Sequence, residues 1–237
     1  MTRRRWIADE VTNNRAALTG AHADHLARAL RARVGQEFDI VANGVLHRGR
    51  ITTMGDKRVE FELGEELPAE ASVVRLTLLL AVFKFDRMEW AIEKCTELGV
   101  TRIIPVIARR TDSHLVSAST KRVERWRRIA LQASEQSRRA SPPEVSDPVK
   151  LRDVLAHTAK LKIVMSETEE QVQLRDVARL ENGEILLALG PEGGWTEDEL
   201  QQFQTQGWIS ASLGPTILRA ETAAIAATAI TLASLSR

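Results

Sequence analysis

The sequence has one cysteine and lacks any apolar segment of membrane-spanning length. With Cys95 as its single thiol, the chain of 237 residues cannot form an internal disulfide. No apolar run approaches the roughly 20 residues of a transmembrane helix. The basic residues near the N-terminus are not followed by the apolar core of a signal peptide. These absences predict a soluble, cytoplasmic protein in a reducing compartment, with Cys95 buried on the apolar face of a helix.

Clusters of metal-ligating residues are also missing. No group of His, Cys and Asp residues has the spacing of a metal site, so we expect no bound metal. The glycine-rich segment 190–194 lacks the Lys and the Ser or Thr of a nucleotide-binding P-loop. Neither this segment nor segment 213–223 contains a histidine, which argues against a histidine as general base in either one.

Charge is nearly balanced over the whole chain but unevenly distributed along it. The formal net charge is +1. Residues 1–50 hold 9 basic and 5 acidic residues, and residues 102–140 hold 10 basic and 3 acidic, whereas residues 141–237 hold 8 basic and 14 acidic. Either basic segment alone is better explained as a solvated helix face. Together they favour a polyanionic partner that meets the N-terminal and middle parts of the chain.

The first 70 residues have the pattern of a small β-rich domain. Segments 37–42 and 45–53 flank Asn43-Gly44, which predicts a β-hairpin with a two-residue turn. Segment 58–63 alternates apolar and charged residues as a half-buried strand does. A short helix is expected over 22–33, with Leu26 and Leu30 on its inner face. Because the polar segment 63–70 contains Gly and Pro, we place the domain boundary there, giving domains 1–70 and 71–237.

Apolar strands alternate with amphipathic helices in the second domain. Strands are expected over 73–83, 103–107, 161–165, 184–189 and 208–213. Helices are expected over 86–98 and 121–139, from Thr196 to about Gln206, and from Arg219 onward. Thr196 and Glu199 have the spacing of a capping box. This alternation predicts an α/β fold with a parallel sheet.

Two strand-loop-helix units follow each other near the end of this domain. Their loops, 190–194 and 213–218, come after strands, and parallel sheets bind ligands at the carboxyl ends of their strands. The glycine-rich loop alone is as well explained by a tight turn. The pair of loops, followed by Arg219 and Glu221 in a largely apolar segment, favours a binding site, because buried charges are costly unless something binds them.

These segments carry a resemblance to a known family. Gly190-Pro-Glu-Gly-Gly194 and Leu213-Gly-Pro-x-x-Leu-Arg-x-Glu-Thr-Ala223 together resemble the RsmE family of 16S ribosomal RNA uridine-N3 methyltransferases, which belong to the SPOUT class. The segment from Lys84 to Val100, the element Glu135-Gln136-x-x-Arg139 and the N-terminal motif His25-Leu-x-x-x-Leu-Arg-x-x-x-Gly35 are similar to the same family. The resemblance covers nearly the whole chain. Thr216 departs from it, since family members often have a basic residue there.

The resemblance implies a fold, a cofactor and partners. It implies a trefoil-knotted SPOUT domain behind an N-terminal PUA-like β-barrel, S-adenosylmethionine as methyl donor, 16S ribosomal RNA within the small subunit as substrate, and a homodimer. The implied cofactor-binding residues are Leu189, Gly190, Pro191, Glu192, Gly193, Gly194, Leu213, Gly214, Leu218, Thr222 and Ala223. The RNA-binding candidates are Arg4, His25, Arg28, Arg31, Arg109, Arg110, Gln136 and Arg139. For His25, Arg28 and Arg31, an ordinary solvated helix face is an equally good explanation.

Methylation at N3 of a uracil requires the loss of the N3 proton and donors for the charge that develops on the uracil oxygens. Arg219 is the expected donor and Glu221 the expected proton acceptor, directly or through water. For Glu221, stabilisation of a helix N-terminus is the favoured alternative role. Glu192 either binds ribose hydroxyl groups or is an exposed loop carboxylate. The apolar segment 224–235 is expected to be buried, either within the subunit or against a second copy.

Two other functions remain open at the level of sequence. One is a different SPOUT RNA methyltransferase, against which the PUA-like element argues. The other is a non-catalytic RNA-binding or ribosome-assembly factor, against which Arg219, Glu221 and the two intact loops argue. The identity of the base, the target nucleotide and the choice between naked RNA and an assembled subunit do not follow from the sequence.

Overall fold

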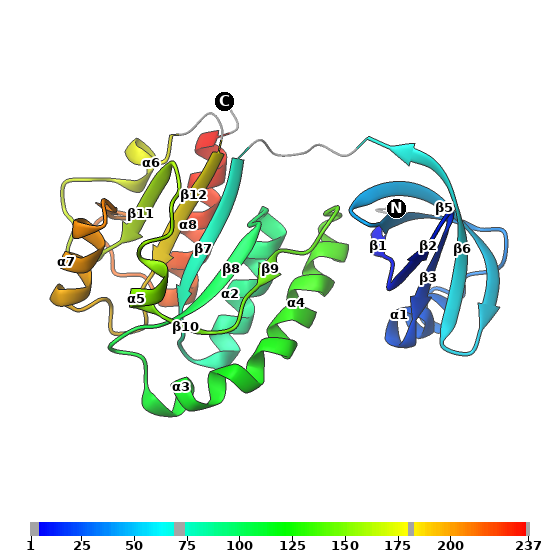
Figure 1. Ribbon diagram of the computed structural model, residues 1–237, viewed down its shortest axis with the longest axis horizontal. Coiled ribbons are helices and arrows are strands. Elements are labelled where there is room, and N and C mark those ends of the chain that lie inside the picture. Colours follow the sequence, from blue (N-terminus) through cyan, green and yellow to red (C-terminus); the bar gives the residue numbers. More distant parts are fainter. Residues whose placement is uncertain (1–4, 69–73, 180–182, 236–237) are drawn as a thin grey trace. The chain divides into compact units, whose positions relative to one another are not determined.

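The computed structural model describes residues 5–68, 74–179 and 183–235, and the chain divides into two compact units (Figure 1). Unit 1 comprises residues 1–71 and 134–142, and unit 2 comprises 72–133 and 143–237. The boundary expected after residue 70 assumed two continuous segments, whereas 134–142 groups with unit 1. The contacts explain this grouping, because Arg5 donates to the carbonyl of Arg138 and His22 Nε2 lies 3.6 Å from Glu135 Oε1.

Unit 1 is built on a curled six-stranded sheet (Figure 1) with the order β1-β4-β5-β6-β3-β2. The strands are β1 (Arg5–Ile7), β2 (Glu10–Thr12), β3 (Arg15–Thr19), β4 (Glu37–Ala42), β5 (Val45–Gly55) and β6 (Arg58–Leu67). The predicted hairpin is confirmed: β4 pairs antiparallel with β5, and the turn residues Asn43 and Gly44 have φ of 51° and 81°. The core of the sheet includes Trp6, Leu18, Ile40 and Phe61.

The helix predicted over 22–33 is wrong in length and in form. Helix α1 (Gly20–Asp24) runs into a π-helical turn, η1 (His25–Ala29), and Arg31 has a φ of 51°. The N–H of Leu30 donates to the carbonyl of His25, five residues earlier, which widens the turn. Residues four apart therefore no longer share a face. Leu26 is buried as expected, but Leu30 is 50% exposed.

Unit 2 is a parallel α/β unit, as predicted (Figure 1). Its sheet has the order β10-β8-β7-β12-β11-β13, with β9 beside β8, and every pairing is parallel. The strands are β7 (Val74–Ala81), β8 (Arg102–Ile107), β9 (Glu144–Val145), β10 (Val149–Lys150), β11 (Leu161–Met165), β12 (Gly183–Leu189) and β13 (Ile209–Ala211). The helices are α2 (Phe85–Leu98), α3 (Ser113–Ser119), η2 (Thr120–Arg122), α4 (Val123–Gln136), α5 (Leu151–Val154), α6 (Leu174–Val177), α7 (Glu197–Thr205) and α8 (Ala220–Leu235).

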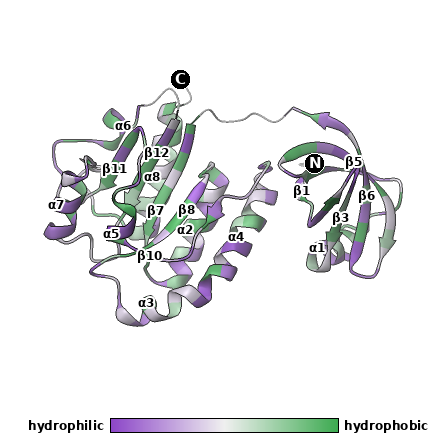
Figure 2. Ribbon diagram, in the orientation of Figure 1, coloured by the Kyte–Doolittle hydropathy of each residue, from purple (hydrophilic) through white to green (hydrophobic). Residues whose placement is uncertain are grey.

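Apolar side chains fill both faces of this sheet, so its strands are mostly hydrophobic (Figure 2). On one face, the strands pack against α2, α4 and α8, with Met88, Trp126 and Ala224 among the buried residues. On the other, they pack against α5 and α7. Helix α4 begins at Val123 and ends at Gln136 rather than spanning 121–139, because a 3-10 turn precedes it and Arg138 adopts a φ of 61°.

Helix α8 packs closely on α2 because the residues between them are small. Ala224, Ala227 and Thr228 of α8 are fully buried, and the Thr228 hydroxyl lies 3.4 Å from Cys95 Sγ. Burial raises the pKa of the Cys95 thiol to about 12, which confirms the prediction of a buried structural cysteine. No helix in the described part of the chain has both the length and the apolar character needed to cross a membrane.

Candidate functional site

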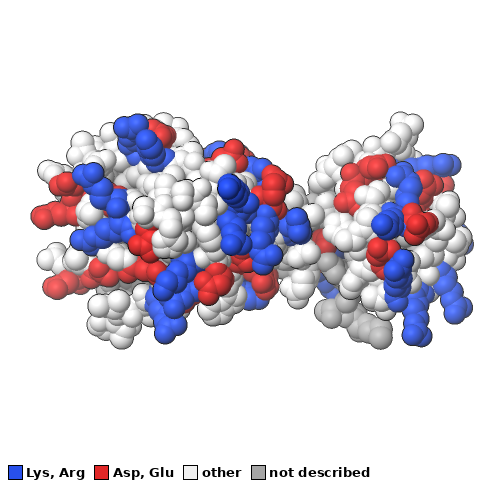
Figure 3. Space-filling view, turned by 90° about the horizontal axis from the view of Figure 1, so that it is seen from below, with Lys and Arg blue, Asp and Glu red and all other residues white. Residues whose placement is uncertain are grey.

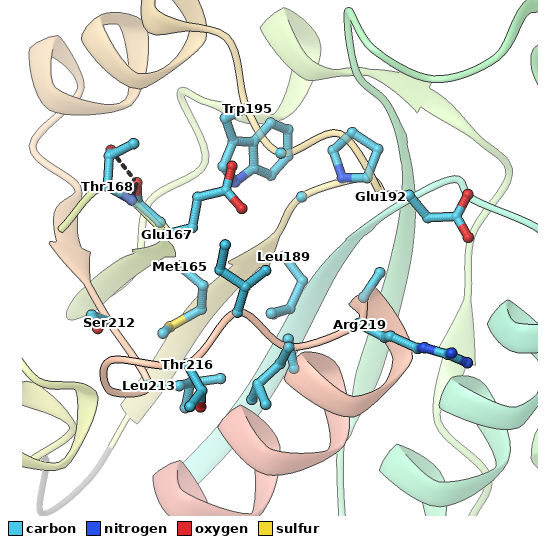
Figure 4. Close-up of a pocket in the computed structure, with 18 of the residues that line it drawn as sticks. Met165, Glu167, Thr168, Leu189, Glu192, Trp195, Ser212, Leu213, Thr216 and Arg219 are labelled. Atoms are coloured by element: carbon cyan, nitrogen blue, oxygen red, sulfur yellow. Dashed lines mark hydrogen bonds between the residues drawn. The ribbon is translucent and has the colours of Figure 1, made fainter.

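A cavity of about 450 Å³ opens in unit 2 at the carboxyl ends of the parallel strands (Figure 4). Its walls come from the segments that follow β7, β11, β12 and β13, because a parallel sheet brings these ends to one edge. The lining residues are Lys84, Arg87, Met165, Ser166, Glu167, Thr168, Leu189, Gly190, Pro191, Glu192, Gly194, Trp195, Leu200, Ser212, Leu213, Gly214, Pro215, Thr216, Ile217, Leu218, Arg219, Ala220 and Ala223.

The glycine-rich loop after β12 forms one wall, and two of its glycines lie where a side chain would not fit. A Cβ atom at Gly190 would lie 3.3 Å from Trp195 Nε1. Gly194 has a φ of +69°, and a Cβ atom there would lie 2.8 Å from Glu167 Oε1. The loop is closed by the N–H of Gly194, which donates to the carbonyl of Pro191 at 2.8 Å. Bare backbone therefore faces the cavity, which suits hydrogen bonding to a ligand.

The opposite wall is the segment 212–219 after β13. The N–H of Gly214 donates to Ser212 Oγ at 3.0 Å, and Gly214 has a φ of +121°. Ile217 is 84% exposed at the edge of this wall. Met165, Leu189 and Leu213 add apolar surface: Met165 and Leu189 end β11 and β12, and Leu213 belongs to the segment 212–219 (Figure 4). The cavity thus combines backbone polar groups with apolar walls, as small-molecule sites commonly do.

Charged side chains line both ends of the cavity. Figure 4 shows the carboxylate of Glu167 near Trp195, whereas Glu192 and Arg219 lie apart from each other on the opposite side of the view. Arg87 donates to Glu192 Oε1 at 2.7 Å. The side chains of Arg219 and Lys84 form no hydrogen bond or ion pair within the described residues, so their charges are available to a ligand.

The structure brings together most of the predicted cofactor-binding residues. Those that line the cavity are Leu189, Gly190, Pro191, Glu192, Gly194, Leu213, Gly214, Leu218 and Ala223, together with the predicted catalytic Arg219. Gly193 and Thr222 do not line it. The Gly193 carbonyl instead accepts a hydrogen bond from Arg110 Nη1 at 2.6 Å. Glu221 is also outside the lining, buried at 3% exposure in the first turn of α8.

The predicted RNA-binding residues divide between the units. Arg109 and Arg110 are exposed in unit 2 just after β8, and Arg110 supports the glycine-rich loop. His25, Arg28, Arg31 and Gln136 are exposed in unit 1. Burial lowers the pKa of Arg139, also in unit 1, to about 10, so it remains a cation at neutral pH. Arg4 lies outside the described residues.

The basic excess of segment 102–140 is partly neutralised inside the protein. Arg125 makes two hydrogen bonds to Glu89, at 2.6 and 2.7 Å. Arg127 contacts Glu124 and Asp147 at 2.7 and 3.1 Å. Figure 3 accordingly shows acidic side chains among the basic ones on the face it presents. The local charge count therefore overstates the positive potential that a partner meets.

Several cavity residues were not predicted. Glu167 and Thr168 directly follow β11, and the rule that ligands bind at the carboxyl ends of parallel strands was sufficient to identify them. Lys84 and Arg87 belong to the segment from Lys84 to Val100 that resembles the RsmE family, but no site role was assigned to them. No sequence pattern, apart from its position after the glycines, indicates that Trp195 lines the cavity. Its indole is directed there by packing alone.

Comparisons with known proteins agree with this geometry. A family model described as an RNA methyltransferase domain matches residues 69–232. The chain is 34% identical to ribosomal RNA small subunit methyltransferase E of Rickettsia conorii, over 92% of this chain and 89% of that protein. It is 29% identical to the protein of the same name from Aquifex aeolicus, over 95% and 97%. The crystal structure of ribosomal RNA small subunit methyltransferase E from Neisseria gonorrhoeae bound to S-adenosyl methionine has a TM-score of 0.85, at 33% identity, and the match covers 96% of both chains.

Proposed function

Because the chain belongs to the ribosomal RNA small subunit methyltransferase E family of RNA methyltransferases, we propose that it transfers a methyl group from S-adenosylmethionine to N3 of a uridine in 16S ribosomal RNA. The observation that carries this proposal is the cavity between the two glycine-containing loops. The residues that form it are the same ones that resemble the family, and the cavity has the volume of a small-molecule site. A non-catalytic RNA-binding factor has no need of such a cavity.

The cavity has the chemistry needed to hold S-adenosylmethionine. Backbone around Gly190, Gly194 and Gly214 offers N–H and C=O groups for an adenine and a ribose, and Leu189, Leu213 and Leu218 offer apolar contact. The absence of a side chain at Gly190 and Gly194 leaves room for Trp195 and Glu167, two residues that line the cavity. Glu192 and Glu167 are acceptors suited to hydroxyl or ammonium groups. When bound, the cofactor supplies the methyl group as a sulfonium.

The protein residues handle the acceptor base. A guanidinium offers a planar set of donors, and Arg219 has no competing partner within the described residues, so we assign it to a uracil oxygen. Glu221 takes the N3 proton through water, because it is 3% exposed and does not line the cavity itself. Its Oε2 atom is buried and has no hydrogen-bond partner within the described residues. N3 then forms its bond to the methyl carbon as the bond from that carbon to sulfur breaks. In the first turn of α8, Glu221 also stabilises the helix N-terminus.

The remaining features of the proposal concern partners and topology. We assign RNA binding to a PUA-like domain of residues 1–70, on the basis of its curled sheet and exposed His25, Arg28 and Arg31. Methyl transfer is assigned to residues 71–237, with the loops 189–194 and 212–219 in a trefoil knot.

The half-buried Ile225, Ile230 and Leu232 of α8 support a homodimer through this helix. The substrate RNA is proposed to lie within the small subunit.

Methyl transfer from labelled S-adenosylmethionine tests the proposal. Small ribosomal subunits without the modification and naked 16S ribosomal RNA are compared as substrates, and the product nucleoside is identified. N3-methyluridine is the expected product. Label on another atom would indicate a different RNA methyltransferase activity. Absence of both label and cofactor binding would overturn the assignment in favour of an RNA-binding factor.

The glycine-rich loop gives a prediction with a matched control. The substitution Gly194→Ala places a Cβ 2.8 Å from Glu167 Oε1 at a φ of +69°, so Glu167 must move within the cavity wall. We expect the Kd for S-adenosylmethionine, measured by calorimetry, to rise about tenfold or more. Gly207 has a similar φ of +73° with no atom near its added Cβ. The substitution Gly207→Ala is therefore expected to cost stability without changing Kd. Equal Kd values for the two variants would contradict the steric explanation.

A further inference from the structure

Arg87 of α2 connects two parts of the proposed site that are far apart in the sequence. Its Nη1 donates to Glu192 Oε1 of the glycine-rich loop at 2.7 Å, and its Nε lies 3.8 Å from Glu221 Oε1 in the first turn of α8. The Arg87 side chain is 31% exposed and lines the cavity. One guanidinium thus contacts a carboxylate of the glycine-rich loop, which lines the cavity, and a buried carboxylate of α8, which lies outside the lining.

The two carboxylates differ in how much they depend on Arg87. The side chain of Glu192 is 32% exposed, so water solvates its charge and the ion pair contributes little to stability. The Glu221 side chain is 4% exposed, and its Oε2 atom is sealed from solvent without a hydrogen-bond partner in the described structure. A buried carboxylate is costly to keep charged unless a cation lies near it. Within the described residues, Arg87 is the cation that forms an ion pair with Glu221.

A surface ion pair is the simpler explanation of the Arg87 contacts. It accounts for Glu192 but not for the second contact, because a buried acid such as Glu221 could have been replaced by a neutral residue at less cost. The Oε2 atom is the unexplained feature, since a buried oxygen that accepts no hydrogen bond is destabilising. A proton arriving from a bound substrate would satisfy that oxygen.

We propose that Arg87 is a positioning residue for methyl transfer, which acts through Glu221 by holding this buried carboxylate in the first turn of α8. This inference rests on the proposed function and deepens it. In this role Arg87 acts on the position of Glu221 and not on the reacting atoms. Arg87 also contacts Glu192 of the glycine-rich loop, which lines the proposed cofactor site. The same side chain therefore influences both cofactor binding and proton acceptance.

The substitution Arg87→Gln separates this role from a structural one. We expect kcat to fall about tenfold to a hundredfold, because Glu221 loses the cation that holds its carboxylate in place. The substitution Glu192→Gln leaves the contact between Arg87 and Glu221 in place, so it is expected to raise KM for S-adenosylmethionine more than it lowers kcat. Arg87→Lys retains the charge and is expected to recover part of the loss. As a control for charge, Arg152→Gln removes an exposed arginine of α5 that lies outside the cavity and should leave kcat unchanged.

A double-mutant cycle with Glu221→Gln is the decisive comparison. If Arg87 acts through Glu221, then Arg87→Gln causes little further loss of kcat in a Glu221→Gln background. Losses that multiply would overturn the inference, as would a wild-type kcat in Arg87→Gln. Thermal unfolding and cofactor Kd show whether each variant is folded. Should Arg87→Gln not fold, Arg87→Lys takes its place in the cycle. Failure of the proposed function is distinguishable, because the unmodified protein would then transfer no methyl group to RNA.

Discussion

Replacing Arg219 by alanine is expected to reduce kcat for methyl transfer about a hundredfold to a thousandfold, with little change in folding or in cofactor affinity. The guanidinium is the proposed donor to the charge that develops on the uracil, and removing one such donor typically costs that much. The Arg219 side chain forms no hydrogen bond or ion pair within the described residues, so its loss leaves no protein group without a partner. Single-turnover rates, together with the Kd values for S-adenosylmethionine and RNA, measure the effect.

The control for Arg219→Ala is Arg152→Ala, which removes an arginine of the same unit that is 73% exposed and outside the cavity. Its kcat should equal that of the unmodified protein. Arg219→Lys keeps a charge but not the planar pair of donors, so its rate is expected to lie between the two. A rate for Arg219→Ala close to that of the control would exclude Arg219 from the chemistry. A loss confined to RNA affinity would make Arg219 an RNA contact only.

Replacing Glu199 by alanine is expected to lower the free energy of unfolding by about 3 kcal/mol. The carboxylate is 5% exposed. It accepts hydrogen bonds from the Arg109 N–H at 2.7 Å, the Thr196 N–H at 2.8 Å and the Thr196 hydroxyl at 3.0 Å. The alanine variant leaves the two backbone donors without these acceptors and removes half of the capping box of α7. Chemical denaturation of the two proteins gives the difference.

Glu197→Ala is the matched control for Glu199→Ala. Glu197 lies in the same first turn of α7 but is exposed, so only its favourable interaction with the helix N-terminus is lost, about 0.5 kcal/mol. Similar losses for the two variants would mean that the carboxylate of Glu199 is not what joins α7 to the end of β8. Glu199 binds the backbone of Thr196, which follows the glycine-rich loop, and of Arg109, which follows β8. The Glu199→Ala variant is therefore also expected to weaken cofactor binding.

Local patterns predicted the parts of the fold that local interactions determine. The Asn43-Gly44 hairpin follows from positive φ at two neighbouring residues, and the Thr196–Glu199 capping box follows from the spacing of two side chains. The buried positions Val123, Trp126 and Ala130 follow from helical periodicity. Each of these features depends on interactions between residues that are close in the sequence. A local pattern is therefore enough to predict it.

Other features depend on contacts that no local pattern encodes. The π-helical turn at His25–Ala29 moved Leu30 to the surface, although the spacing of Leu26 and Leu30 was that of an ordinary amphipathic helix. The order of the strands, with β7 between β8 and β12, is decided by packing across the whole sheet. Arg87 was missed for the same reason. Its partners Glu192 and Glu221 are more than a hundred residues away, and only the folded sheet brings them within reach.

The pairing of β7 with β12 has a consequence for how the protein reaches its native state. These neighbours at the middle of the sheet are joined by a hydrogen bond from Thr77 Oγ1 to Glu184 Oε1, between residues 107 positions apart. Pairing of such distant segments carries a large loop-closure cost and is intrinsically slow. The β7–β8 pair and helix α2 form from nearby segments, but the cavity needs β12, β13 and α8 in place. During synthesis the binding site is therefore among the last parts to assemble, and until then the apolar edge of β7 is exposed to aggregation.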